Sequence, residues 1–151
     1  MLEEVVPEAT KRQYCSGLRG YTPFGTEHAK DHRVPDLKEF WQVGRDPATV
    51  GDARGASNDV DALPPNLWPR ELPAFRATFE SLFAALDETG RTLLEALAPG
   101  LGLPPDHFDP LVRSGNSVLR VIHYPPVPAD ADPQAVRSAA HEDINFLTIL
   151  V

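Results

Sequence analysis

The feature that most constrains the fold is an apolar run at residues 144–151 (INFLTILV), in which only Asn145 and Thr148 are polar. A strand that is apolar on both faces is typical of a position inside a sheet that is covered on both sides. We therefore expect a buried strand at residues 139–151. A second strand is expected at residues 117–124 (SVLRVIHY), which are β-branched and aromatic and end at Pro125-Pro126.

One long helix is the other strong prediction. Apolar side chains recur at steps of mostly three, four and one, which is the pattern of one helix face. They are Leu72, Phe75, Phe79, Leu82, Phe83, Leu86, Leu93, Leu94 and Leu97. Pro73 suits the first turn and Gly100 suits the end, so we expect a helix over residues 73–98 that packs on a sheet or on another helix.

The remaining segments are predicted to be short or irregular, as sixteen Pro and ten Gly suggest. Residues 7–14 form a short polar helix, and residues 16–32 and 44–65 form loops. Asp36 is expected to cap a short helix over residues 36–43, with Glu39 completing a capping box.

Two strands and one helix cannot cover both faces of the apolar strand. We therefore expect a fragment, whose partner strands lie beyond residue 151 or come from another chain. An unpaired apolar strand also favours self-association through this C-terminal segment.

Composition excludes several classes of protein. The net charge of −8, from 14 basic and 22 acidic residues, argues against a nucleic-acid surface. The single Cys15 cannot form an internal disulfide, which fits a reducing compartment. No leader peptide and no run of about 20 apolar residues is present, so we expect a cytoplasmic protein that does not contact membranes.

The tripeptide His141-Glu142-Asp143 is the candidate for metal chemistry. On the expected strand, residues i and i+2 point to the same side, so His141 and Asp143 would converge. One further His would complete a 2-His-1-carboxylate site, which holds non-haem Fe(II). The alternative is a protein without a metal site, in which this tripeptide is an exposed strand end.

The order of motifs resembles the isopenicillin N synthase-like oxygenases. The strand at residues 117–124, the Pro125-Pro126 turn and the segment AAHEDINFLTILV look like the jelly-roll core of that family. The upstream stretches GLRGYTPFG, DLKEFW and NLWP (residues 66–69) are similar to its N-terminal segment. The likeness runs from about residue 7 to residue 151, and most members of the family use Fe(II) and 2-oxoglutarate.

The resemblance implies roles for individual residues. His141 and Asp143 would be the first two iron ligands, and Tyr124 would donate a hydrogen bond to an anchoring carboxylate. That carboxylate belongs to 2-oxoglutarate in most members and to the substrate in isopenicillin N synthase itself. Ile122 and Glu142 depart from the commonest pattern of the 2-oxoglutarate members, so both co-substrate assignments stay open. Arg19 and Tyr21 fall near the family's substrate-facing Arg and Tyr.

The resulting prediction is an α+β fold. Residues 1–115 would be an N-terminal helical and loop segment, and residues 116–151 the first strands of a truncated jelly-roll (double-stranded β-helix) core. The expected function is a non-haem Fe(II)-dependent dioxygenase that oxidises a small molecule with O2 and, in most such enzymes, 2-oxoglutarate. The family's distal His and its Arg-x-Ser would lie beyond residue 151. The alternative is an inactive remnant, or a fragment that a partner chain completes.

Overall fold

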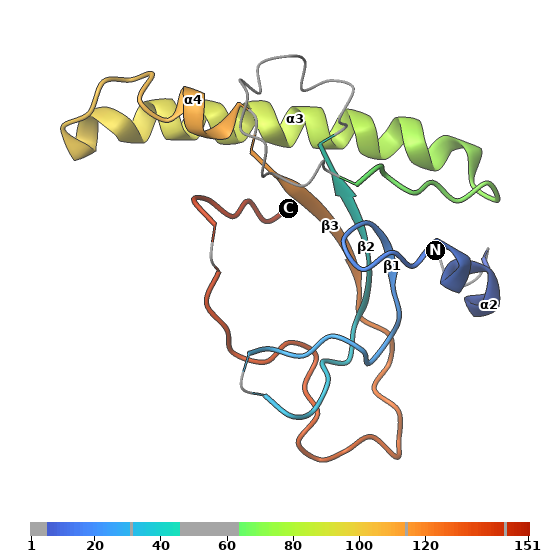
Figure 1. The fold of residues 1–151 in the computed structure, drawn as a ribbon. Helices are drawn as coiled ribbons and strands as arrows, with labels where there is room; N and C mark the ends of the chain where they lie inside the picture. Colours follow the sequence, from blue (N-terminus) through green and yellow to red (C-terminus); the bar gives the residue numbers. More distant parts are fainter. Residues whose placement is uncertain (1–5, 31, 46–63, 114, 144) are drawn as a thin grey trace.

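The computed structural model describes residues 6–30, 32–45, 64–113, 115–143 and 145–151. Its centre is a three-stranded antiparallel sheet in the order β1 (Gly20–Thr22), β2 (Glu39–Gly44) and β3 (Val118–His123). The long helix α3 (Pro73–Leu97) crosses one end of this sheet (Figure 1). A long helix on a three-stranded antiparallel sheet agrees with the expected α+β class.

The hydrophobic core lies between the sheet and α3. Trp41 of β2 pairs with Tyr21 of β1 and with Val121 of β3. Because alternate side chains of a strand share a face, Trp41 and Val43 both point to the core. Phe75 of α3 meets Trp41 edge-on, with ring centroids 5.2 Å apart. This aromatic contact anchors the helix on the sheet.

The predictions for α3 and β3 are confirmed. Pro73 lies in the first turn of α3, and the helix continues into the 3₁₀ turn η4 (Ala98–Leu101). Gly102 then takes a left-handed conformation with φ 73°, which ends the helical segment. A short helix α4 (Asp109–Val112) precedes β3. The expected helix at residues 7–14 is present as α2 (Glu8–Lys11) and the 3₁₀ turn η1 (Arg12–Tyr14).

Two predictions for the N-terminal half are wrong. The expected loop at residues 16–32 contains β1, and the expected helix at residues 36–43 is replaced by β2. Asp36 and Glu39 therefore do not form a capping box. The aromatic and β-branched side chains of β2 are buried between two neighbouring strands, and this tertiary pairing outweighs the local capping signal. Most of the expected loop at residues 44–65 lies outside the described residues.

The expected C-terminal strand is also not observed. Residues 139–143 and 145–151 contain no strand, and Figure 1 draws them as a loop beside the sheet. A strand needs a neighbour to satisfy its backbone groups, and no described segment pairs with this one. Its apolar end is exposed, with Leu150 89% and Val151 95% accessible.

Candidate metal and co-substrate site

His141 and Asp143 lie close enough together to share a metal ion. Their Nε2 and Oδ1 atoms are 3.7 Å apart, and both side chains are about half exposed. The His141 Nδ1 atom is 2.8 Å from the carbonyl oxygen of Ala139. A carbonyl oxygen only accepts hydrogen bonds, so Nδ1 carries a proton, and in the neutral imidazole the lone pair is then on Nε2. This is the state in which an imidazole binds a metal.

The Asp143 carboxylate is also held by a hydrogen bond. Its Oδ2 accepts a hydrogen bond of 2.5 Å from the Thr148 hydroxyl, and its Oδ1 is the atom that faces His141. One nitrogen and one oxygen donor suit Fe(II). Among the described residues, however, no group of three or more His, Cys, Asp or Glu side chains converges as a metal site. As a metal site, the pair would supply two ligands, and a metal ion would need further donors.

Tyr124 follows directly after β3 and is partly exposed. No described residue forms a hydrogen bond with its hydroxyl group, which is thus available to a ligand. No described contact joins Tyr124 to His141 or Asp143 either. The structure therefore leaves the expected role of Tyr124 as a prediction.

Arg19 and Tyr21 are both buried. The Tyr21 hydroxyl contacts the carboxylates of Glu39 and Glu8, and burial together with these contacts raises the pKa of Tyr21 far above its usual range. The Arg19 guanidinium donates a 2.6 Å hydrogen bond to the Asn116 side chain, and burial lowers the pKa of Arg19. Both side chains thus have partners inside the protein, and neither has a described contact with His141.

Sequence reasoning missed a set of buried charged residues just before and at the start of β2. Asp36, Lys38 and Glu39 are all buried. Glu39 accepts hydrogen bonds from Lys11, Tyr21 and His123, which belong to α2, β1 and β3. The available signal was the presence of these charges next to Leu37, Phe40 and Trp41, because a charged side chain inside an apolar segment needs a buried partner.

A separate pocket of about 520 Å³ opens beside α2. Its lining includes Glu8, Phe24 and three prolines after β3 (Pro125, Pro126 and Pro128), and it contains none of the candidate site residues.

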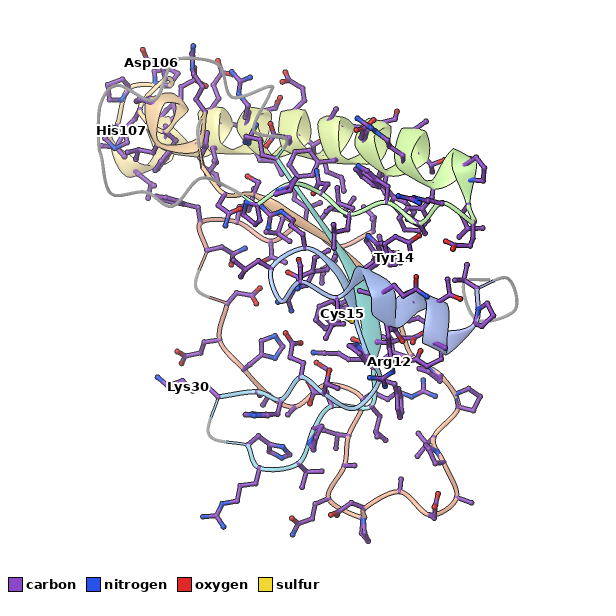
Figure 2. All side chains as sticks on the ribbon, turned by 45° about the vertical axis from the view of Figure 1, so that its right-hand side comes forward. Arg12, Tyr14, Cys15, Lys30, Asp106 and His107 are labelled. Atoms are coloured by element: carbon purple, nitrogen blue, oxygen red, sulfur yellow. The ribbon has the colours of Figure 1, made fainter. Side chains whose placement is uncertain are left out.

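Cys15 lies near Tyr14, and His107 lies at the C-terminal end of α3 (Figure 2). Of the helices that the structure describes, none is long and apolar enough to cross a membrane.

Comparison with known proteins identifies relatives along most of the chain. The "2-oxoglutarate-dependent dioxygenase caaD" of Aspergillus niger is 34% identical over an alignment of 137 residues, which covers 88% of this chain and 39% of that protein. The "2-oxoglutarate-dependent dioxygenase htyE" of Aspergillus rugulosus is 38% identical over an alignment of 140 residues, which covers 88% of this chain and 40% of that protein. The chain therefore spans about two-fifths of the length of these relatives. No family model matches the chain.

Solved structures lead to the same family. A protein of the 2OG-Fe(II) oxygenase family from Caulobacter crescentus has 43% sequence identity and a TM-score of 0.65, over 85% of this chain and 41% of that one. A C-terminally truncated protein of Neurospora crassa, solved in its apo form, has 26% identity and a TM-score of 0.57, over 83% of this chain and 42% of that one. By sequence and by fold, this chain belongs to the family of 2-oxoglutarate-Fe(II) oxygenases.

Proposed function

We propose that the chain is part of a non-haem Fe(II)-dependent oxygenase that oxidises a small molecule with O2 and 2-oxoglutarate. The observation that carries the proposal is the His141–Asp143 pair, in which one nitrogen and one oxygen atom face each other at 3.7 Å. Because His141 Nδ1 donates a hydrogen bond to the Ala139 carbonyl, the neutral imidazole has its lone pair on Nε2, where it can bind a metal. The donor set thus fits Fe(II), and the names of the relatives support the same cofactors.

When bound, the iron would couple the oxidation of substrate by O2 to the decarboxylation of 2-oxoglutarate. The contribution of the chain is to hold the iron and to orient its co-substrate. His141 and Asp143 would provide two ligands, and the Ala139 carbonyl and the Thr148 hydroxyl would keep their donor atoms in place. Tyr124 would donate its hydroxyl proton to a carboxylate of 2-oxoglutarate, which is a strong acceptor.

The names of the relatives favour 2-oxoglutarate over the alternative in which Tyr124 binds a carboxylate of the substrate. The alternative rests on Ile122 and Glu142, which depart from the usual pattern of 2-oxoglutarate members. Equilibrium binding of 2-oxoglutarate to the Tyr124→Phe variant separates the two, because only the first assignment predicts weaker binding.

A second candidate is a chain that is inactive by itself and is completed by other residues or by another chain. Two features favour it: the described residues supply only two metal ligands, and the chain spans about two-fifths of its relatives. The proposed division is an N-terminal helical and loop segment at residues 1–115, which also contains β1 and β2, and the first strands of the jelly-roll core at residues 116–151. The exposed C-terminal residues would favour self-association, which sedimentation velocity can measure. The cytoplasmic location stays a prediction from the sequence.

The metal site can be tested without turnover. We would titrate the 151-residue chain with Mn²⁺, an oxygen-stable substitute for Fe(II), and follow paramagnetic broadening of amide signals around residue 141. His141→Ala and Asp143→Ala should each abolish the broadening. His107→Ala serves as a matched control, because this exposed histidine lies at the far end of α3 (Figure 2). Undiminished broadening in His141→Ala would show that the pair is not a metal site.

A further inference from the structure

Asp36 makes a buried contact with the segment that carries the candidate iron ligands. The residue is only 1% exposed, and its Oδ1 accepts a 3.0 Å hydrogen bond from the backbone N–H of Ala139. Ala139 is itself buried and lies two residues before His141. The next residue, Leu37, donates its backbone N–H to the Val136 carbonyl at 2.8 Å. The segment before the ligands is thus fixed at two points to the residues that lead into β2.

The other oxygen of Asp36 begins a row of ion pairs. Oδ2 accepts a 2.9 Å hydrogen bond from the Lys38 ammonium, which also pairs with Glu27 at 2.9 Å. Glu27 in turn pairs at 3.1 Å with Arg120 of β3, whose guanidinium lies over the Phe40 ring. The row therefore connects β3, the strand that leads to Tyr124, with the backbone that leads to His141.

The Asp36 carboxylate is ionised in this position. Burial alone raises the pKa of Asp36, but hydrogen bonds from Lys38 and from the Ala139 N–H bring that pKa below its usual value. A hydrogen bond from a backbone N–H to an ionised carboxylate is stronger than one between neutral groups. The contact with Ala139 is also the last described backbone hydrogen bond that ties this segment to a distant part of the chain before His141.

We propose that Asp36 is a positioning residue for the candidate iron site, and that it fixes the segment bearing His141 and Asp143 relative to the strand that leads to Tyr124. This inference rests on the proposed function. Asp36 acts through the backbone and does not touch the metal. It would therefore affect metal affinity by narrowing the range of positions that the two ligands occupy.

The test compares Asp36→Ala and Asp36→Asn in the 151-residue chain. Two quantities are measured by NMR: the Mn²⁺ dissociation constant from broadening near residue 141, and the hydrogen-exchange rate of the Ala139 amide. Loss of an outer hydrogen bond around a metal site typically weakens affinity by about 10–100-fold. Because this site is half exposed, we expect about a tenfold loss in Asp36→Ala, with faster exchange at Ala139. Asp36→Asn keeps an acceptor oxygen and should retain most of the affinity.

Asp87→Ala is the control for general destabilisation. Asp87 is a partly buried carboxylate on α3, paired with Arg45 and without a described contact to residues 136–143. Its loss should lower stability and leave the Mn²⁺ affinity unchanged. If Asp36→Ala binds Mn²⁺ as tightly as the wild type, or if Asp87→Ala loses as much Mn²⁺ affinity as Asp36→Ala, the positioning role is wrong. Either result leaves the proposed metal site itself untouched. If His141→Ala binds Mn²⁺ as tightly as the wild type, the proposed metal site itself is wrong and the role of Asp36 fails with it.

Discussion

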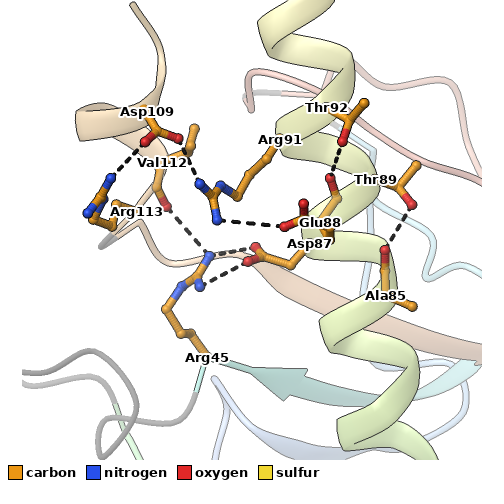
Figure 3. A network of polar contacts seen from close by, with 10 residues as sticks. All are labelled: Arg45, Ala85, Asp87, Glu88, Thr89, Arg91, Thr92, Asp109, Val112 and Arg113. Atoms are coloured by element: carbon orange, nitrogen blue, oxygen red, sulfur yellow. Dashed lines mark hydrogen bonds and ion pairs between the residues drawn. The ribbon is translucent and has the colours of Figure 1, made fainter. Parts of the chain in front are cut away.

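The clearest test of the fold is the ion pair that holds α3 against the end of β2 (Figure 3). Arg45 donates to both oxygens of Asp87, at 2.6 and 3.1 Å, and its Nε donates to the Gly115 carbonyl at 3.1 Å. Both charged side chains are mostly buried, with 14% and 21% of their surface exposed. This single guanidinium therefore joins β2, α3 and the segment that precedes β3.

Removing one partner of a fully buried ion pair costs about 3–5 kcal/mol. In Asp87→Ala the guanidinium keeps its carbonyl acceptor and some access to water, so we expect a loss of about 2 kcal/mol in the free energy of unfolding. For a chain of this size, that loss corresponds to a melting temperature lower by about 4–8 °C. Arg45→Lys should also destabilise, since an ammonium cannot make the paired hydrogen bonds.

Chemical denaturation followed by circular dichroism measures this change directly. The control is Glu80→Ala, which breaks an exposed pair with Arg76 on the same helix and should cost no more than about 0.5 kcal/mol. If Asp87→Ala and Glu80→Ala lower the free energy of unfolding equally, the Arg45–Asp87 contact does not hold the helix on the sheet and the reasoning is refuted.

Three further predictions concern single residues. Burial alone raises the pKa of Glu39, but its hydrogen bonds, led by that from Lys11, hold the pKa below the ordinary value. Its stabilising contribution is thus present above the unfolded-state pKa and is lost as pH falls through the folded-state pKa; an unchanged acid limb of the stability profile in Glu39→Gln would contradict this. Gly44→Ala should destabilise, because a Cβ there would overlap the Arg19 guanidinium, which is buried and hydrogen-bonded to Asn116, whereas Gly100→Ala meets no atom within 4 Å; equal melting temperatures would refute the contrast. Tyr124→Phe should keep the wild-type melting temperature, since Tyr124 is 38% exposed and its hydroxyl has no described hydrogen-bond partner; a marked drop would reveal a structural role.

The elements that could be predicted are those whose signal is local. The apolar stripe of α3 and the β-branched run of β3 both carry their own periodicity, and both are observed. β2 could not be predicted, because Asp36 and Glu39 mimic a helix cap locally while their partners lie far away in sequence. The expected strand at residues 139–151 fails for the opposite reason: its composition is right, but no described strand lies beside it.

The residues of the candidate site also differ in whether the sequence could predict them. His141 and Asp143 were accessible to reasoning because they are two residues apart in a recognisable tripeptide. Asp36 was not, since its acceptor role depends on Ala139, 103 residues later in the chain. A contact between residues so distant in sequence leaves no periodic pattern. Long-range partners of buried charges therefore become visible only once the fold is known.

The register of the sheet also sets the order in which the molecule can assemble. Phe40 lies opposite Ile122, so the β2–β3 ladder closes a loop of about 80 residues, whereas β1 and β2 lie much closer together in sequence. Closing a long loop carries a larger entropic cost and slows folding, while a helix such as α3 forms from local contacts within microseconds. On a ribosome, β1, β2 and α3 emerge before β3. The strand leading to the candidate site is thus the last of the three to join, and β2 has an unpaired edge until it does.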